Sequence, residues 1–312
     1  MKRAEMLMLM LVFVLWHVLP AMADGNVRAT MSSSGNLKIT GDKRSNQIVV
    51  TNNGIGDIRV EGMSGTTVNG GNGGVDFAIT TSNTLEGKLD IILKGGDNYV
   101  EIRDITVIKK MQLKCGHGDN TIGIFNATLV DDVSLNTGHG NDFIVLAGDT
   151  LIAEKLAIKT SGGDDSIEIA ECASNYGKTI IKTNSGNDLI NLQGYYLGRL
   201  ALDTGKGIDE LYISQYINVN RVKIFLGRDD DKILFASTAN LTGTVTINGG
   251  KGDNDRIVQD DGLSTDFYLM SKFIENSAVE TDADNEPAVI TSQMVLDYTA
   301  RGGDPLDISC PE

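Results

Sequence analysis

Residues 135–146, LNTGHGNDFIVL, decide the fold because they are the clearest copy of a phrase that recurs along the chain. Each copy contains a turn rich in Gly, Asp and Asn, and the turns are anchored at positions 96, 118, 140, 163, 186, 207, 229 and 252. Successive anchors are 22, 22, 23, 23, 21, 22 and 23 residues apart. A repeat of this length is typical of a solenoid, in which each unit buries its apolar side only against its neighbours.

Alignment of the copies places apolar residues in columns on both sides of the turn. The column before the turn contains Leu113, Leu135, Ile158, Ile181, Leu202, Ile224 and Ile247. The column just after the turn contains Ile122, Ile144, Ile167, Ile190, Leu211, Ile233 and Ile257. Most positions between apolar columns are polar, and this period-two alternation predicts strands with one face directed inward. We therefore expect an all-β fold, a right-handed parallel β-helix of about 22 residues per coil.

The chain divides into four segments. Residues 1–23 have the pattern of a secretion signal, with Lys2 and Arg3 before an apolar run and an A-x-A site at 21–23. An uncleaved anchor helix is the alternative, but the run of about 14 residues is shorter than the roughly 20 that a membrane span needs. Residues 24–88 are expected to form irregular N-terminal coils and a cap, 89–262 the regular repeats, and 263–312 a C-terminal capping region over the open sheet edge.

The charge of the chain limits its partners. The sequence carries 42 acidic and 27 basic residues, and without residues 1–23 the counts are 41 and 25, a net charge of −16. Nucleic acids and anionic membranes bind basic faces, so both are excluded as expected partners. We expect a protein that is secreted or held at the cell surface, with the periplasm as an alternative, and whose mature chain has no transmembrane segment. Its expected partner is an extracellular or cell-surface polysaccharide or protein.

Two neighbouring columns of Asp and Asn at the turn are the candidate functional residues. Stacked carboxylates about 5 Å apart repel one another unless a cation or a hydrogen-bond network neutralises them. One interpretation is a row of calcium sites, since calcium takes six to eight oxygen ligands. The other is a structural ladder of turn side chains bonded to backbone N–H groups, which the interspersed Asn residues and the break at Ile208 favour. The candidate calcium ligands are Asp119, Asn141, Asp142, Asp164, Asp165, Asp188, Asp209, Asp230, Asp231, Asp253 and Asp255.

The phrases at 137–144, TGHGNDFI, and 249–257, GGKGDNDRI, resemble the hemolysin-type (RTX) calcium-binding repeat. That family's unit is a Gly-Gly-x-Gly-x-Asp-x-apolar-x nonapeptide, and the resemblance implies calcium held between adjacent turns of a parallel β-roll. This chain departs from the pattern, because it has one such phrase per 22 or so residues where that family has two per coil. The phrase at 65–70, GTTVNG, followed by the coils with Gly-Asn-Asp turns, also resembles secreted repeat proteins of unknown role from planctomycete-type bacteria.

These observations lead to a structural or adhesive extracellular module, with calcium along the Asp/Asn edge as an open question. The alternative is a carbohydrate-active β-helix enzyme, a polysaccharide lyase or hydrolase, that uses acidic residues and a tyrosine cluster at Tyr195, Tyr196, Tyr212 and Tyr216. No catalytic residue is singled out, because no coil carries a recognisable catalytic set. His117 and His139 occupy one column in adjacent coils, where stacked rings would offer a weak transition-metal site.

Overall fold

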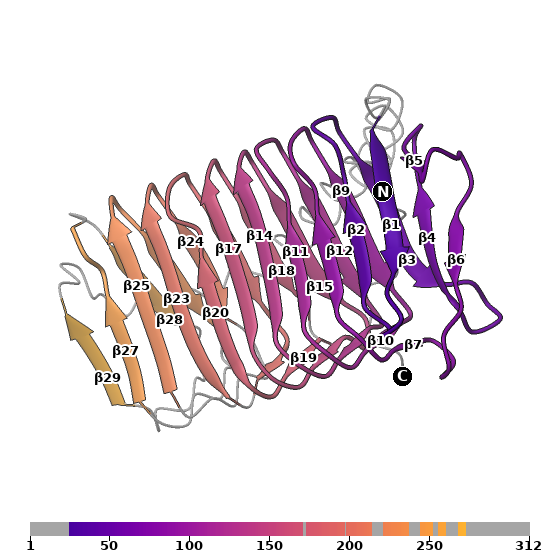
Figure 1. Cartoon of the computed structure of the whole chain (residues 1–312). Helices are drawn as coiled ribbons and strands as arrows, with labels where there is room; N and C mark the ends of the chain where they lie inside the picture. Colours follow the sequence, from indigo (N-terminus) through magenta and orange to yellow (C-terminus); the bar gives the residue numbers. More distant parts are fainter. Residues whose placement is uncertain are drawn as a thin grey trace, which may run out of the picture.

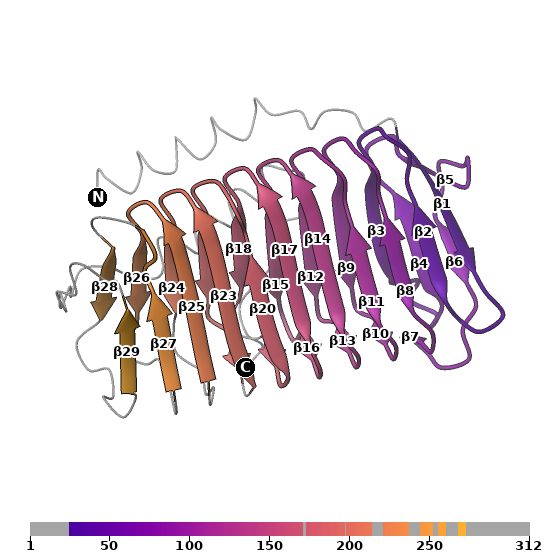
Figure 2. The same ribbon diagram turned by 60° about the vertical axis from the view of Figure 1, so that its left-hand side comes forward.

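The computed structural model describes residues 25–170, 173–196, 198–213, 221–236, 244–251, 255–259 and 268–272. Their regular structure is entirely β, and parallel coils about 22 residues apart form a solenoid of about 7 turns, which confirms the predicted fold class. Figures 1 and 2 show the coils as one elongated stack from β1 to β29. The expected signal segment, 1–23, lies outside the described residues.

Each regular coil has three sides. In one coil, β14 (Val133–His139) leads through the Gly-Asn-Asp turn to β15 (Phe143–Ala147), and then to β16 (Leu151–Ile152). The next coil begins with β17 (Leu156–Gly162), which pairs in parallel with β14. The strands equivalent to β14, β15 and β16 form sheets of twelve, eleven and six strands, here called sheet 1, sheet 2 and sheet 3.

The strands of each sheet follow one another along the stack. Those of sheet 1 are β5 (Thr67–Val68), β1 (Asn26–Met31), β2 (Leu37–Thr40), β8 (Leu89–Ile92), β11 (Met111–Lys114), β14, β17, β20 (Lys178–Lys182), β23 (Arg199–Lys206), β25 (Arg221–Arg228), β27 (Thr244–Asn248) and β29 (Tyr268–Lys272). Those of sheet 2 are β6 (Val75–Phe77), β4 (Ile58–Gly62), β3 (Gln47–Asn52), β9 (Tyr99–Arg103), β12 (Thr121–Phe125), β15, β18 (Ser166–Ile169), β21 (Leu189–Leu192), β24 (Glu210–Ile213), β26 (Lys232–Phe235) and β28 (Arg256–Gln259). Those of sheet 3 are β7 (Thr84–Leu85), β10 (Thr106–Val107), β13 (Thr128–Leu129), β16, β19 (Ser174–Asn175) and β22 (Tyr195–Tyr196).

The register confirms the apolar columns. Leu135 pairs with Leu113 on one side and Ile158 on the other, and Ile144 is flanked by Ile122 and Ile167 in the same way. All of them are buried in one continuous aliphatic core that runs the length of the described stack. Identical coils can share a core because parallel strands lie about 4.8 Å apart, so each branched side chain packs on its counterpart.

The N-terminal segment begins the stack in a different way. Strands β2 and β3 form a coil that pairs in parallel with β8 and β9. Strand β1 is antiparallel to β2, β4 is antiparallel to β3, and β6 is antiparallel to β4. The irregular coils expected over 24–88 therefore comprise one parallel coil and a set of antiparallel strands at the first end of the stack. At the other end β29 continues sheet 1, and the rest of the expected capping region lies outside the described residues.

The outer faces of sheets 1 and 2 differ. Sheet 1 directs exposed lysines outward, among them Lys114, Lys159 and Lys223. Sheet 2 buries its outer face as well, in two clusters: one contains Tyr99, Phe125, Phe143, Val145, Ala147 and Ala170, and the other Tyr212, Leu234, Ala236 and Val258. Sheet 1 is therefore the broad face of the solenoid that meets solvent. No helix among the described residues is long and apolar enough to span a membrane.

Candidate functional site

The turn between sheets 1 and 2 carries the Asp/Asn columns, and a glycine fixes its shape. Gly140 has φ +132°, and a Cβ on it would lie 2.2 Å from the carbonyl oxygen of Gly118 in the preceding coil. Only glycine adopts this conformation and permits this approach. The chain then turns so that Asn141 lies outside and Asp142 inside the solenoid.

The inner column is a ladder of buried side chains. Its members are Asn46, Asn98, Asn120, Asp142, Asp165, Asp188, Asp209, Asp231 and Asp255, each no more than 2% exposed. From Asn98 onward, the Oδ1 atom of each member accepts a hydrogen bond from the backbone N–H of the member one coil earlier. The distance is 2.9 Å from the Asp142 nitrogen to Asp165 Oδ1, and 2.8 Å from the Asp188 nitrogen to Asp209 Oδ1. One oxygen of every carboxyl group in the ladder thus ties two coils together.

The outer column is a second ladder that runs in the opposite sense. The Oδ1 atom of Asp119 accepts the N–H of Asn141, one coil later, at 2.7 Å, and Asn141 Oδ1 accepts the N–H of Asp164 at 2.8 Å. Ile208 donates its N–H to Asn187 Oδ1 at 2.8 Å. The backbone N–H of Ile208 therefore takes part in the outer ladder, but its side chain has no oxygen to accept an N–H from the next coil, so the outer ladder is interrupted after this residue.

Burial changes the acidity of the inner column. Desolvation, the largest cause, raises the pKa of Asp165 and of Asp231 to about 8, that of Asp188 to about 7, and those of Asp142 and Asp209 to about 6. Neighbouring carboxylates raise these pKa values further, and the backbone N–H donors lower them. A substantial part of the inner column is therefore protonated at neutral pH.

A column of buried threonines lies beside the inner carboxyl groups. Thr183 donates its hydroxyl to the carbonyl of Thr204 at 3.0 Å, and Thr204 donates to the carbonyl of Leu226 at 2.7 Å. Thr183 also lies within hydrogen-bond reach of Asp188, but its hydroxyl proton points to Thr204, and the buried Oδ2 atom of Asp188 accepts no hydrogen bond in this arrangement. A hydroxyl group that donates a hydrogen bond can still accept one through its oxygen lone pairs. The Thr183 hydroxyl oxygen can therefore accept a hydrogen bond from a proton on Asp188 Oδ2. A neutral Asp completes this polar ladder without a cation.

The structure separates the candidate calcium ligands into two groups. Asp119, Asn141, Asp164 and Asp230 are exposed, and Asp142, Asp165, Asp188, Asp209, Asp231 and Asp255 are buried. Asp253 lies outside the described residues. The part of the chain that is described contains no group of three or more His, Cys, Asp or Glu arranged to hold a metal ion. At Asp165, Asp188 and Asp209 one carboxyl oxygen accepts a backbone N–H, and the neighbouring hydroxyls of Thr160, Thr183 and Thr204 donate to carbonyl oxygens.

Two further candidate groups can be placed. The rings of His117 and His139 are stacked, with centroids 5.0 Å apart and planes 25° apart, as the shared column predicted. Tyr212 is 1% exposed and packs with Leu234 and Val258, so it is not an exposed platform for a sugar ring. Tyr216 lies outside the described residues, and so do the side chains of Tyr195 and Tyr196.

Comparison with protein-family models, with curated proteins and with solved structures found no match to this chain. The resemblance to hemolysin-type repeats therefore rests on the turn phrases alone. What the structure supports is the β-solenoid itself, with about 7 turns.

Proposed function

We propose that this protein is a rigid extracellular module, exported and held at or near the cell surface, with a structural or adhesive role. The observation that carries the proposal is the uninterrupted register of the stack. Ten strands of sheet 1, from β2 to β29, pair in parallel. The inner ladder and the aliphatic core cross every interface between the regular coils that the structure describes. At about 4.8 Å per strand, they span roughly 43 Å. Bending such a rod would break hydrogen bonds on several sides of a coil.

The proposal predicts an elongated, surface-exposed chain. We expect small-angle scattering of the purified protein to give a pair-distance distribution with the long tail of a rod. We also expect antibody labelling of intact producing cells to match that of permeabilised cells. A cytoplasmic location would contradict the extracellular role. A screen of acidic polysaccharides is expected to give binding without release of products, and product release would favour the lyase or hydrolase alternative.

Calcium is tested separately by the thermal stability of the chain. We expect the Tm to be the same in millimolar calcium and in chelator, because Oδ1 atoms of both columns already accept backbone N–H groups. The measurement is a circular dichroism melt in both buffers. A rise in Tm with calcium that is lost in Asp119→Asn would place calcium on the exposed outer column, as the resemblance to hemolysin-type repeats implies. The control is Asp131→Asn, which also removes one negative charge but lies away from the Gly-Asn-Asp turn.

A further inference from the structure

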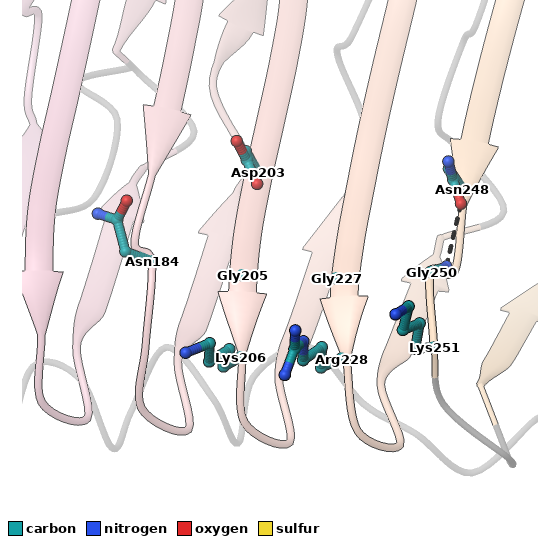
Figure 3. A pocket seen from close by; sticks show the side chains of 9 residues that line it. All are labelled: Asn184, Asp203, Gly205, Lys206, Gly227, Arg228, Asn248, Gly250 and Lys251. Atoms are coloured by element: carbon teal, nitrogen blue, oxygen red, sulfur yellow. Dashed lines mark hydrogen bonds between the residues drawn. The ribbon is translucent and has the colours of Figure 1, made fainter.

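Sheet 1 carries a shallow groove of about 680 Å³ at the carboxyl ends of β23, β25 and β27. Its floor is bare backbone at Gly205, Gly227 and Gly250 (Figure 3). A Cβ on Gly227 would lie 1.9 Å from the carbonyl oxygen of Gly205, and one on Gly250 would lie 2.0 Å from that of Gly227. Any larger residue at these positions would clash with the backbone of the preceding coil, so the floor of the groove has to remain free of side chains.

One wall of the groove is a row of cations. Lys206, Arg228 and Lys251 are exposed and occupy equivalent positions in three successive coils. Figure 3 shows their side chains next to one another at the turn. Parallel register spaces their Cα atoms about 4.8 Å apart. Over the described residues, no ion pair joins any of the three to an acidic side chain.

Acidic residues also lie near the groove, and among the described residues none of them forms an ion pair with Lys206, Arg228 or Lys251. Asp203 forms an ion pair with Lys182 at 2.7 Å, on the side away from the cationic row. Asp229 follows Arg228 in the turn and accepts the N–H of Gly207 at 3.1 Å, and Asp230 is exposed beyond it. The chain as a whole is strongly acidic, with a net charge of −15, but charges beyond the Debye length of about 8 Å are screened at physiological salt.

We propose that this groove binds a linear polyuronate, a polysaccharide with one carboxylate on each sugar ring. An extended chain of such rings advances by about 5 Å per ring, close to the spacing of parallel strands, so the carboxylates that face the row recur at multiples of the distance between its cations. Arg228 provides a planar guanidinium that pairs with a carboxylate through two hydrogen bonds. The inference deepens the adhesive part of the proposed function and rests on that function for its extracellular location.

The remaining features of the groove suit a sugar chain better than a nucleic acid. The wall opposite the cations carries Asp203 and Asn248, whose polar groups match sugar hydroxyls. Phe225 is not one of the residues that line the groove, but it pairs in the sheet with both Asp203 and Asn248 and is 44% exposed, so its ring lies beside this wall and is available to one sugar face. Single-stranded nucleic acids are bound by several stacking aromatics along a basic track, and this site offers one aromatic ring and three cations.

The test is binding of fluorescently labelled tetragalacturonate to the full chain, measured by anisotropy at low salt. Wild type is expected to bind, and the affinity should fall as salt is raised. Replacement of the three cations, Lys206→Gln, Arg228→Gln and Lys251→Gln together, should weaken binding about tenfold or more. Lys159→Gln removes an exposed lysine from sheet 1 outside the groove and should leave binding unchanged. Phe225→Ala should weaken binding a few-fold without changing the charge.

Several outcomes would overturn the proposal. The first is that the wild type does not bind tetragalacturonate, and the second is that the triple variant, with an unchanged Tm, binds it as tightly as the wild type. The others are that the wild type binds the uncharged, methyl-esterified tetramer, or an oligothymidylate of the same charge, as tightly as tetragalacturonate. The proposed structural role is judged by scattering and cell labelling, which do not involve the groove. If the protein is rod-shaped and exposed at the cell surface but does not bind tetragalacturonate, the assignment of the groove is wrong and the proposed structural role still stands.

Discussion

At about pH 8 the chain is expected to unfold at a temperature at least about 10 °C lower than at about pH 5. Burial raises the pKa values of five inner carboxyl groups above the value of about 3.9 that they have in the unfolded chain; they belong to Asp142, Asp165, Asp188, Asp209 and Asp231. The folded state therefore binds more protons than the unfolded state between these values. The stability that the protonated groups provide is complete below about pH 4 and is lost as the pH rises through 6 to 8. Glu168, buried on the outer face of sheet 2 with a pKa raised to about 8, acts in the same direction.

Asparagine substitution separates the ladder from general charge repulsion. Asn120 already shows that Asn fits the inner column, because its Oδ1 accepts the N–H of Asn98 while its Nδ2 donates to Asp142 Oδ1 at 2.9 Å. The double variant Asp165→Asn, Asp188→Asn should raise the Tm at about pH 8 by several degrees and flatten its pH dependence. Asp164→Asn, in the outer column one residue away, is the matched control; its charge is the smallest of the causes that raise the pKa values of Asp188 and Asp209, so it should change the pH dependence much less than the double variant does.

Alanine at the same position distinguishes hydrogen bonding from charge. Asp165→Ala leaves the buried N–H of Asp142 without its acceptor, which costs about 1–3 kcal/mol at any pH. We therefore expect Asp165→Ala to lower the Tm at both pH values and Asp165→Asn to raise it at the higher one. Circular dichroism melts across the pH range measure both effects. If Asp165→Asn is less stable than wild type at about pH 8, the inner carboxyl groups are ionised in the native state and the ladder has been misassigned.

The repeat period and the period-two alternation were enough to predict the coils and both apolar columns. The position of the Asp columns also had a signal in the sequence. Asp142, Ile144 and Leu146 alternate on one face of the chain, so the strand pattern directs Asp142 inward with the two apolar residues. The turn glycine obscured this signal, because alternation is not expected to continue through a turn. The two columns of candidate ligands share one turn but lie on opposite sides of the wall, the outer column exposed and the inner column buried.

Other features depended on contacts that a single repeat does not encode. Phe125 and Phe143 occupy outward positions of sheet 2 and are nonetheless buried, and alternation alone predicts exposure there. The antiparallel pairing of β3 with β4 lies where the repeat has degenerated. The cationic groove arises because the position between the turn glycines varies freely, and only the stacking of coils brings Lys206 and Arg228 together.

Gly140→Ala is expected to destabilise the chain by about 3 kcal/mol or more, or to prevent folding. The added Cβ would lie 2.2 Å from a backbone oxygen of Gly118, at a φ of +132° that L-residues rarely adopt. The two coils cannot move apart to make room, because the N–H of Gly140 donates to Gly162 at 2.9 Å and that of Gly118 donates to His139 at 2.8 Å. Relief of the clash therefore requires the loss of hydrogen bonds between coils on this side of the stack.

Gly70→Ala is the comparison at a glycine with a positive φ but without a clash. Gly70 also has a positive φ, +80°, but a Cβ there would meet no atom within 4 Å. Its substitution carries the conformational cost alone, about 1 kcal/mol, and chemical denaturation of both variants measures the difference. Equal losses of unfolding free energy at the two sites would mean that the coils can separate at the turn to make room for the Cβ. The solenoid would then not be rigid at this turn, which would contradict the proposed rod. A much larger loss at Gly140 would instead explain why glycine recurs at this position in nearly every coil: the spacing of the stack leaves no volume for a side chain.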